Sequence, residues 1–342
     1  MIMLPLPPPK ISLASLPTPI RKLSRLSERE GGPNIWLKED YLTGFTLSGN
    51  KVRKLEYLLA DALSKGATHV ITCGGIQSNH CRATAFACAQ LGLKCALILR
   101  NDPGYGGDSS RGQANHFLDA IAGAIVDIHP VKEYQKGLQG LFDSAAEKIR
   151  LEGGTAYCIP TGGSNGLGVW GYVECVHEIQ QQCRDLHVSP DLLVCASGSG
   201  GTQAGLCLGL LDSALDAEVH AYAVCDSAAY FDKKVRADIS ACCWGAGMSE
   251  EAVSSVLGAL KIETNENYIG PGYAQASDDV YEFIQDMAVL EGLLLDPVYT
   301  GKAFFGMVSE LRQGKFAHMK DILFVHTGGG FGLFSHAKHF VT

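Results

Sequence analysis

An apolar strand, a glycine-rich turn, a helix and a second strand follow one another in this chain, and that order limits its fold more than any other feature. Residues 67–73 form an apolar run that enters the pair Gly74-Gly75, and an alanine-rich helical pattern covers residues 79–91. Residues 94–100 form the next apolar run. A strand, a helix and a strand within about 35 residues have the size of a βαβ unit.

The same order returns later in the chain. A predicted strand at 191–196 leads through the turn 197–201 into a helix at 202–211, and a strand follows at 219–224. Near the end, a strand at 321–326 runs into a series of glycines. Because these strands are apolar without a clean alternation, we expect mostly parallel sheets that helices cover on both faces. The predicted class is α/β, doubly wound.

Length and composition favour two domains. The chain has 342 residues, of which 46% are hydrophobic, and this is more than a single core normally holds. Polar segments at 101–112 and 181–190 are predicted to be surface connections. The apolar start from Met1 to Pro9 lacks a basic region and is interrupted by prolines, so we expect an extended arm and not a signal peptide.

Charge and cysteine usage disfavour several classes of function. The net charge of -8 disfavours a general nucleic-acid binder, and no apolar stretch of about 20 residues predicts a membrane span. The twelve cysteines include no Cys-x-x-Cys pair and no metal-like spacing, which indicates free thiols in a reducing compartment. We therefore expect a soluble protein without nucleic-acid, membrane or metal partners, in the cytoplasm or in an organelle such as the mitochondrion.

The segment Ser48-Gly49-Asn50-Lys51 is the first of four that could carry chemistry. Its ordinary interpretation is a loop that leads into a basic helix. The alternative is covalent catalysis, because burial lowers the pKa of a lysine and makes its amine a nucleophile towards carbonyl groups. The local sequence leaves both open.

Two further segments lie at predicted helix starts. Ser78 and Asn79 follow Gly74-Gly75 at a position where free N–H groups favour a carboxylate, although either residue could simply cap the helix. The glycine-rich segment 197–202 suits a phosphate, since small residues let backbone amides wrap it. It is not a dinucleotide fingerprint, because Gln203 stands where the third glycine is required.

The fourth segment is Asp296 to Lys302, together with the glycine run after His326. Tyr299 could act as an acid or a nucleophile, but an isolated tyrosine is more often a packing residue. His326 closes an apolar strand and is interpreted as structural.

Together and in this order, the segments resemble the D-cysteine desulfhydrase/1-aminocyclopropane-1-carboxylate (ACC) deaminase family, which are pyridoxal-phosphate enzymes of fold type II, similar to the tryptophan synthase β subunit. The resemblance runs from about Leu16 to the last residues. It is carried by Ser-Gly-Asn-Lys at 48–51, Gly-Gly-Ile-Gln-Ser-Asn-His at 74–80, the loop 197–202, Leu-Asp-Pro-Val-Tyr-Thr-Gly-Lys at 295–302 and His-Thr-Gly-Gly at 326–329.

The resemblance implies an architecture of two doubly wound, mostly parallel three-layer domains. Residues 1–53 and 166–342 would form a large domain, and residues 54–165 a small domain inserted in it. The cofactor would lie in the cleft between the two domains. A homodimer is usual for the relatives.

The resemblance also implies roles for matching residues. Lys51 would form the Schiff base with pyridoxal phosphate, Asn79 would contact its 3-hydroxyl and Thr327 would face its pyridine nitrogen. Catalytic roles fall on Lys51, Ser78 and Tyr299. The phosphate is expected at Lys54, Ser199, Gly200, Gly201 and Thr202, and the amino acid substrate at Gln77, Ser78, Asn79, Tyr273 and Tyr299.

Two threonines favour one reaction within the family. ACC deaminases typically carry a glutamate at the position of Thr300 and a leucine at that of Thr327. A carboxylate on the pyridine nitrogen makes the ring a strong electron sink, which ring opening needs more than loss of a thiolate does. We therefore expect α,β-elimination of D-cysteine to pyruvate, hydrogen sulfide and ammonia, with Lys51 or Tyr299 as the base. ACC deaminase, L-cysteate sulfo-lyase and a catalytically silent carrier or sensor remain alternatives.

Overall fold

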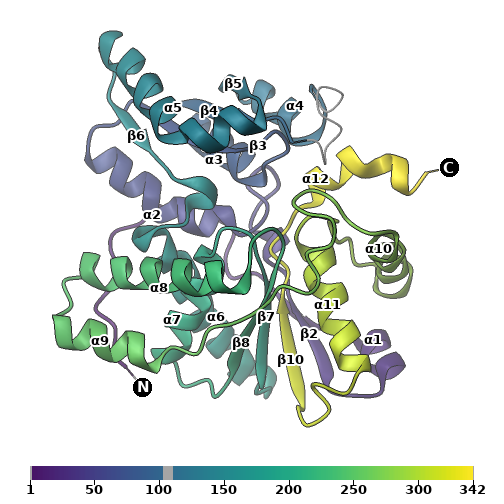
Figure 1. Cartoon of the computed structure of the whole chain (residues 1–342). Helices are drawn as coiled ribbons and strands as arrows, with labels where there is room; N and C mark the ends of the chain where they lie inside the picture. The colour runs from purple at the N-terminus through teal and green to yellow at the C-terminus, as the bar shows by residue number, and fades with distance from the viewer. Residues whose placement is uncertain (1, 103–110, 342) are drawn as a thin grey trace.

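The computed structural model describes residues 2–102 and 111–341, and the strands in these residues form two separate sheets (Figure 1). The larger sheet has the order β1 (Ile20–Lys22), β2 (Asn34–Lys38), β10 (Asp321–Val325), β7 (Leu192–Ser197), β8 (Glu218–Ala223), β9 (Glu263–Asn265). The smaller has the order β5 (Ile125–His129), β4 (Lys94–Arg100), β3 (His69–Gly75), β6 (Ala156–Cys158). Every pairing is parallel except β1 with β2. The predicted α/β, mostly parallel class is confirmed.

Helices cover both faces of the larger sheet. One face packs on α6 (Gly166–Leu186), α7 (Gly201–Leu211), α8 (Ala228–Gly245) and α9 (Glu250–Ala259). The other packs on α1 (Ser24–Glu30), α10 (Asp278–Glu291) and α11 (Thr300–Arg312). Successive strand residues alternate between the two cores, so that Leu193 lies in the first and Leu192 in the second. Figure 1 shows the resulting three layers in the lower half of the molecule.

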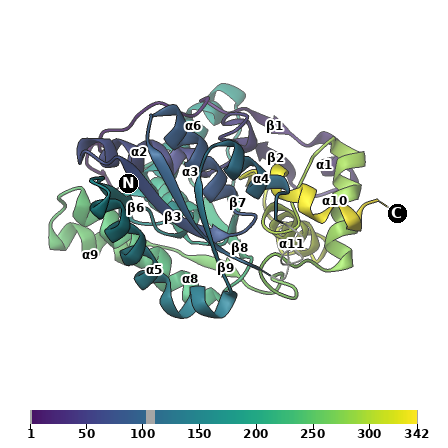
Figure 2. The same ribbon diagram turned by 90° about the horizontal axis from the view of Figure 1, so that it is seen from above.

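The smaller sheet repeats this arrangement on a smaller scale. Its one face packs on α2 (Lys51–Ser64) and α3 (Asn79–Gln90), and its other face on α5 (Val131–Leu151). Figure 2 shows α5 on the opposite side of β3 from α2 and α3. The short helices α4 (Ala114–Ile121) and α12 (Gly330–Leu333) lie beside each other, and α4 also contacts β5. The C-terminal segment therefore lies next to the helices of the smaller sheet. None of the described helices is long and apolar enough to cross a membrane.

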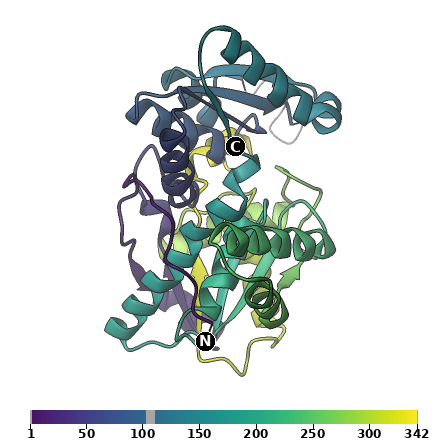
Figure 3. The same ribbon diagram turned by 90° about the vertical axis from the view of Figure 1, so that its left-hand side faces the viewer.

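The N-terminal segment has the extended form that the prolines predict. Residues 2–13 contain no helix or strand. The N–H of Ile2 donates to the carbonyl of Leu211 (2.8 Å), and the N–H of Ile11 donates to that of Glu56 (3.1 Å). Figure 3 shows this arm running from the large-sheet half of the molecule towards α2, where Ile11 and Leu13 pack against the core of the smaller sheet.

Some predicted bounds are wrong for tertiary reasons. Gly74 and Gly75 were expected in a turn but belong to β3, where they pair with Leu99 and Arg100 of β4. The predicted connection at 181–190 is also wrong over its first half, because α6 continues to Leu186. Ile179 and Cys183 continue the helix's apolar face into the core, although their neighbours are polar. Most of the predicted loop at 101–112 lies outside the described residues, and the domain boundaries at 53/54 and 165/166 stay a prediction.

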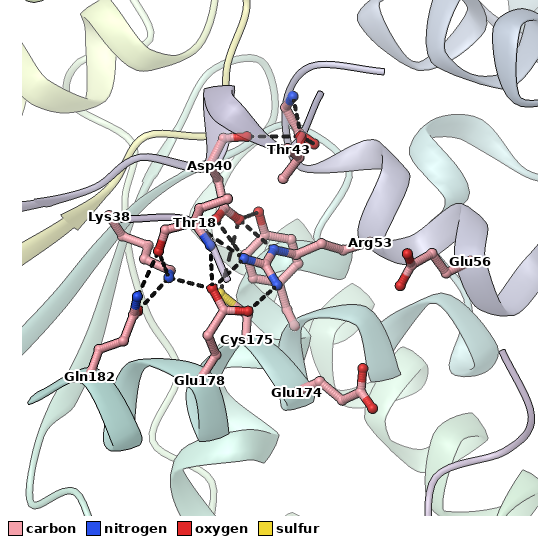
Figure 4. A network of polar contacts seen from close by, with 12 residues as sticks. Thr18, Lys38, Asp40, Thr43, Arg53, Glu56, Glu174, Cys175, Glu178 and Gln182 are labelled. Carbon is pink, nitrogen blue, oxygen red and sulfur yellow. Dashed lines mark hydrogen bonds and ion pairs between the residues drawn. The ribbon is translucent and has the colours of Figure 1, made fainter. Parts of the chain in front are cut away.

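A buried network of charged side chains fixes α2 against α6 and β2 (Figure 4). Arg53 donates through Nε and Nη2 to the two carboxylate oxygens of Asp40 (2.8 Å each) and through Nη1 and Nη2 to Glu178 (3.0 Å each). Lys38 also donates to Glu178, and its Nζ lies 2.6 Å from the carbonyl oxygen of Thr18. The two cations therefore converge on the same carboxylate, which ties the first turns of α2 to the body of the larger sheet.

Candidate functional site

The carboxyl ends of strands from both sheets open on one cavity of about 820 Å³. Gly75 and Arg100 end β3 and β4 on one side, while on the other Ser197 ends β7 and Thr327 follows β10 of the larger sheet. A cavity of this size accommodates a cofactor together with a small substrate. Of the residues predicted for the site, those that line it are Lys51, Ser78, Asn79, Ser199, Gly200, Thr202, Tyr273, Tyr299 and Thr327.

Lys51 begins α2 and lines the cavity because the turn before it is pinned to the loop after β10. The N–H of Asn50 donates to the carbonyl of Thr327 (3.0 Å). Gly49 has a φ of +103°, and a Cβ there would lie 2.6 Å from the same carbonyl oxygen, so this close approach requires glycine. The Thr43 hydroxyl also bonds to both backbone groups of Gly49 (2.9 Å each).

The amine of Lys51 is prepared for chemistry by its surroundings. Desolvation lowers its pKa from 10.5 to about 8, and only the Cys81 thiol acts in the opposite direction. A substantial neutral fraction therefore exists near neutral pH, and the neutral amine is the nucleophilic form.

The start of α3 combines a helix cap with a face of the cavity. Ser78 is the N-cap, and its Oγ accepts a hydrogen bond from the N–H of Cys81 (3.2 Å), so the capping interpretation is confirmed. Its hydroxyl proton stays able to donate, and both Ser78 and Asn79 line the cavity. Gln77 lies outside the lining, where its Oε1 accepts from the N–H of Asn115 (2.9 Å).

The glycine-rich loop ends in the helix start that the sequence predicts. Gly200 has a φ of +83°, and α7 begins at Gly201. Ser164 organises this region, because its Oγ lies 2.8 Å from Ser199 Oγ, 3.2 Å from the N–H nitrogen of Gly201 and 3.2 Å from Lys54 Nζ. Lys54 and Gly201 themselves lie just behind the cavity lining.

Ser164 was missed by the sequence-based interpretation. It follows the short helix η4 (Thr161–Gly163), and this Thr-Gly-Gly-Ser segment comes just after strand β6. The pair Gly162-Gly163 is a sequence signal of the same kind as Gly74-Gly75, and it marks this segment.

Tyr273 and Tyr299 meet on the cavity wall. Their hydroxyl oxygens are 2.5 Å apart, and their rings lie edge to face with centroids 6.0 Å apart. Tyr299 immediately precedes α11, whereas Tyr273 lies in the segment between β9 and α10. The hydroxyls of two tyrosines that are distant in the sequence are therefore joined by one hydrogen bond.

Of the two threonines that guided the choice of reaction, Thr327 lines the cavity and Thr300 does not. Thr300 is buried, and its hydroxyl donates to the carboxylate of Asp296 (2.7 Å). That carboxylate also accepts from the N–H groups of Val298, Tyr299 and Thr300 (2.9 Å each). Thr300 therefore shapes the turn that presents Tyr299.

Charged residues that the sequence did not single out also line the cavity. Arg100 forms an ion pair with Asp102 and lies 5.1 Å from the centroid of the Tyr273 ring. Lys234 donates to Asp238 and to the carbonyl of Ser164 (3.2 Å). Arg100 closes a predicted strand and could have been found from that position, whereas nothing near Lys234 in the sequence marks it.

The arrangement suits a ligand that carries both a phosphate and a carbonyl group. The first N–H groups of a helix such as α7 favour a phosphate, and Lys54 stands behind them. Burial and the neighbouring charge of Lys51 hold the pKa of Lys54 well below its usual value, because both destabilise the charged ammonium. A bound anion would stabilise that charged form. Ser197 adds a buried hydroxyl on the cavity wall that has no partner among the described atoms.

Gly162 lies so close to Ser199 and Lys51 that only a glycine fits at this position of the cavity wall. Its φ is +67°, and a Cβ there would lie 2.3 Å from Ser199 Oγ and 3.5 Å from Lys51 Nζ. A side chain at this position would thus enter the space between the phosphate-type loop and the amine. Among the described residues, no group of three His, Cys, Asp or Glu side chains is placed to hold a metal.

Known proteins resemble this chain over nearly its whole length. The bifunctional D-cysteine desulfhydrase/1-aminocyclopropane-1-carboxylate deaminase of Arabidopsis thaliana mitochondria is 42% identical, over 96% of this chain and 80% of its own. A D-cysteine desulfhydrase of Klebsiella pneumoniae is 39% identical, over 97% of each chain. The crystal structure of an ACC deaminase homologue is 35% identical with a TM-score of 0.82, and it covers 97% of this chain and 95% of its own.

The family comparison agrees with these relatives. The model of the family described as "Pyridoxal-phosphate dependent enzyme" matches residues 11–328. The matched range includes both sheets and nearly all of the cavity wall. The chain therefore belongs to the pyridoxal-phosphate-dependent enzyme family.

Proposed function

We propose that this chain catalyses the α,β-elimination of D-cysteine, in which D-cysteine and water give pyruvate, hydrogen sulfide and ammonia. The observation that carries the proposal is that Lys51, Ser78, Tyr299 and Thr327 lie on the wall of one cavity. The names of the relatives support the substrate class. Thr327 supports the choice of reaction, because a hydroxyl near the pyridine ring gives a weaker electron sink than a carboxylate, and thiolate is a good leaving group.

The residues present fit pyridoxal phosphate. Its phosphate would be held by Ser199, Gly200 and Thr202 at the start of α7 with Lys54 behind them, and its aldehyde carbon by Lys51. When bound, the cofactor withdraws electrons from the Cα of an amino acid and so makes the Cα proton removable.

The substrate carboxylate would bind at the start of α3. Ser78 can donate its hydroxyl proton there, and the free N–H groups of the helix and its dipole favour an anion. Asn79 would stand beside the cofactor ring, where Asn115 orients it by donating to its Oδ1 (2.9 Å). Gln77 would support this wall indirectly through its own bonds to Asn115.

Two groups on the wall can handle protons. We assign removal of the Cα proton to Lys51 Nζ, whose pKa of about 8 leaves both a neutral and a charged form near neutral pH. Tyr299 Oη, paired with Tyr273, would then supply or hold a proton near the departing sulfur. On this assignment a Tyr299→Phe variant still exchanges the Cα proton of the substrate with deuterium oxide, whereas a Lys51→Ala variant does not.

The test is a comparison of four substrates with the purified protein. D-cysteine should release equal amounts of sulfide and pyruvate, and L-cysteine, ACC and L-cysteate should react at least about tenfold more slowly. Predominant formation of 2-oxobutanoate from ACC would instead establish ACC deaminase, the second candidate, which the similarity to the solved ACC deaminase homologue favours. Sulfite release from L-cysteate would establish the sulfo-lyase. Lys51→Ala should abolish turnover and the visible absorbance of the bound cofactor.

We also propose a homodimer in a reducing compartment, the cytoplasm or an organelle such as the mitochondrion. All twelve cysteines are free, which supports the reducing compartment. Phe117, Ile121 and Ile125 are each more than half exposed near the edge strand β5, and a partner subunit could cover them. Light scattering after size-exclusion chromatography would measure the mass, and the 36.5 kDa of one chain would refute the dimer.

A further inference from the structure

Lys302 is a buried cation at the end of the segment Asp296 to Lys302, which also contains Tyr299. The proposed reaction gives Lys302 no role. It stands in the first turn of α11 and is 1% exposed. Its Nζ donates to the carbonyl oxygens of Ile269 and Gly272, at 2.7 Å each. The lysine therefore ties α11 to the segment between β9 and α10.

That segment has little regular structure of its own. Between residues 269 and 275 the described structure has no helix, and its one bridge pairs Gly272 with Gln275. Gly270, Gly272 and Ala274 have φ angles of +69°, +141° and +60°. A segment that turns in this way exposes backbone carbonyl groups, and the ammonium of Lys302 donates hydrogen bonds to two of them.

Burial of this ammonium has a cost that a neutral side chain would avoid. Desolvation lowers the pKa of Lys302 to about 8, although the Asp296 carboxylate and Cys225 act to raise it. A buried cation with two carbonyl acceptors is weak as a source of overall stability, because its loss of hydration offsets most of the attraction. Its benefit is geometric, since the two bonds fix the segment in one conformation.

The segment that Lys302 holds carries Tyr273, and the helix that carries Lys302 begins directly after Tyr299. The contact between the two phenols therefore depends on how these two elements are joined. Lys302 lies outside the lining of the large cavity, so it would not touch the substrate or the cofactor. It borders instead a separate cavity of about 90 Å³ beside Gly270 and Phe305.

We propose that Lys302 is a positioning residue that sets the hydroxyl of Tyr273 against that of Tyr299. It acts through the two carbonyls and not by contact with reacting atoms. The inference rests on the proposed function for its activity readout, because Tyr299 is the proton-handling group of that reaction.

The variants are Lys302→Met, which keeps the length and loses the charge, and Lys302→Arg, which keeps the charge. Lys261→Met is the matched control, because the Lys261 side chain is 84% exposed. We expect kcat of Lys302→Met to fall about 10- to 100-fold, the effect of misplacing a catalytic group by about 1 Å, with little change in cofactor binding. The arginine variant should recover part of this loss, and the control should equal the unaltered protein.

A double variant separates positioning from general damage. If Lys302 acts through Tyr273, Lys302→Met combined with Tyr273→Phe should be no slower than the slower single variant. Losses that multiply would overturn the proposal, and so would a loss of activity in Lys302→Met that matches a loss of folded protein. In Lys302→Ala, methylammonium would have access to the vacated space and should restore activity, whereas sodium chloride at the same ionic strength should not.

A readout without turnover keeps the inference independent of the reaction. In the cofactor-free protein, backbone hydrogen exchange should quicken in residues 266–276 of Lys302→Met and remain unchanged in the sheets. Unchanged exchange in that segment would overturn the proposal. An unaltered protein that released no product from D-cysteine would refute the proposed function, and the exchange experiment would still decide the role of Lys302.

Discussion

The lowered pKa of Lys51 predicts how the cofactor-free protein should recapture pyridoxal phosphate. Formation of the covalent bond requires the neutral amine. Below its pKa the neutral fraction rises tenfold per pH unit, and above it the fraction is constant. With a pKa of about 8 the capture rate should therefore rise up to about pH 8 and then level off.

The size of the effect follows from the two pKa values. At pH 8 about half of Lys51 is neutral, whereas a lysine with the ordinary pKa of 10.5 would be about 0.3% neutral, a ratio of about 160. The cause is desolvation by the residues around the start of α2, so the advantage should disappear when the protein is unfolded.

Stopped-flow absorbance of the cofactor would measure the capture rate from pH 6 to pH 11. Free acetyl-lysine methylamide, mixed with the same cofactor, corrects for titration of the cofactor itself, and Lys51→Ala should give no covalent absorbance band. A protein rate that continued to rise tenfold per pH unit up to about pH 10 would refute the explanation by desolvation.

Three further substitutions test the site and the fold. Gly162→Ala should weaken cofactor binding about tenfold or more in equilibrium dialysis, because the left-handed backbone costs a non-glycine residue about 1–2 kcal/mol and the new Cβ would overlap Ser199 Oγ. Unchanged affinity would contradict this view of the site. Arg53→Met should lower the free energy of unfolding in urea by about 3–5 kcal/mol at pH 7, since Asp40 would be left buried without its partner. Burial raises the pKa of Asp40, but Arg53, Lys38 and Tyr172 together outweigh burial and hold that pKa below 3.8. The stability from the ionised carboxylate is therefore present above pH 3.8 and is lost as the pH falls through the folded pKa, so the deficit of Arg53→Met should shrink in acid; a deficit independent of pH would contradict this. Phe324→Ala in β10 should cost about 3–5 kcal/mol by the same urea assay, because the ring is fully buried against Phe304, and a loss below about 1 kcal/mol would show that the core closes around the cavity.

Much of the fold could be predicted because its signals are local. The predicted strand at 94–100 coincides with β4, and the predicted strands at 191–196 and 219–224 lie within one residue of β7 and β8. A continuous apolar run indicates a strand that is buried on both faces, as strands of parallel sheets are. The bounds failed where packing decided them, as at Gly74 and Gly75, whose pairing with β4 extends β3 through an expected turn.

The sequence by itself determined the two units of strand, glycine-rich turn, helix and strand, the last strand, and the glycine positions where a loop could approach a ligand, because backbone preference and apolar pattern are properties of neighbouring residues. Only the tertiary structure decided which side chains share the cavity. Thr300 donates a hydrogen bond to Asp296, and Gln77 accepts one from Asn115. Ser164 accepts a hydrogen bond from Lys54 and also contacts the glycine-rich loop. The same holds for Lys51, whose pKa depends on the desolvation that distant segments impose when they meet around it.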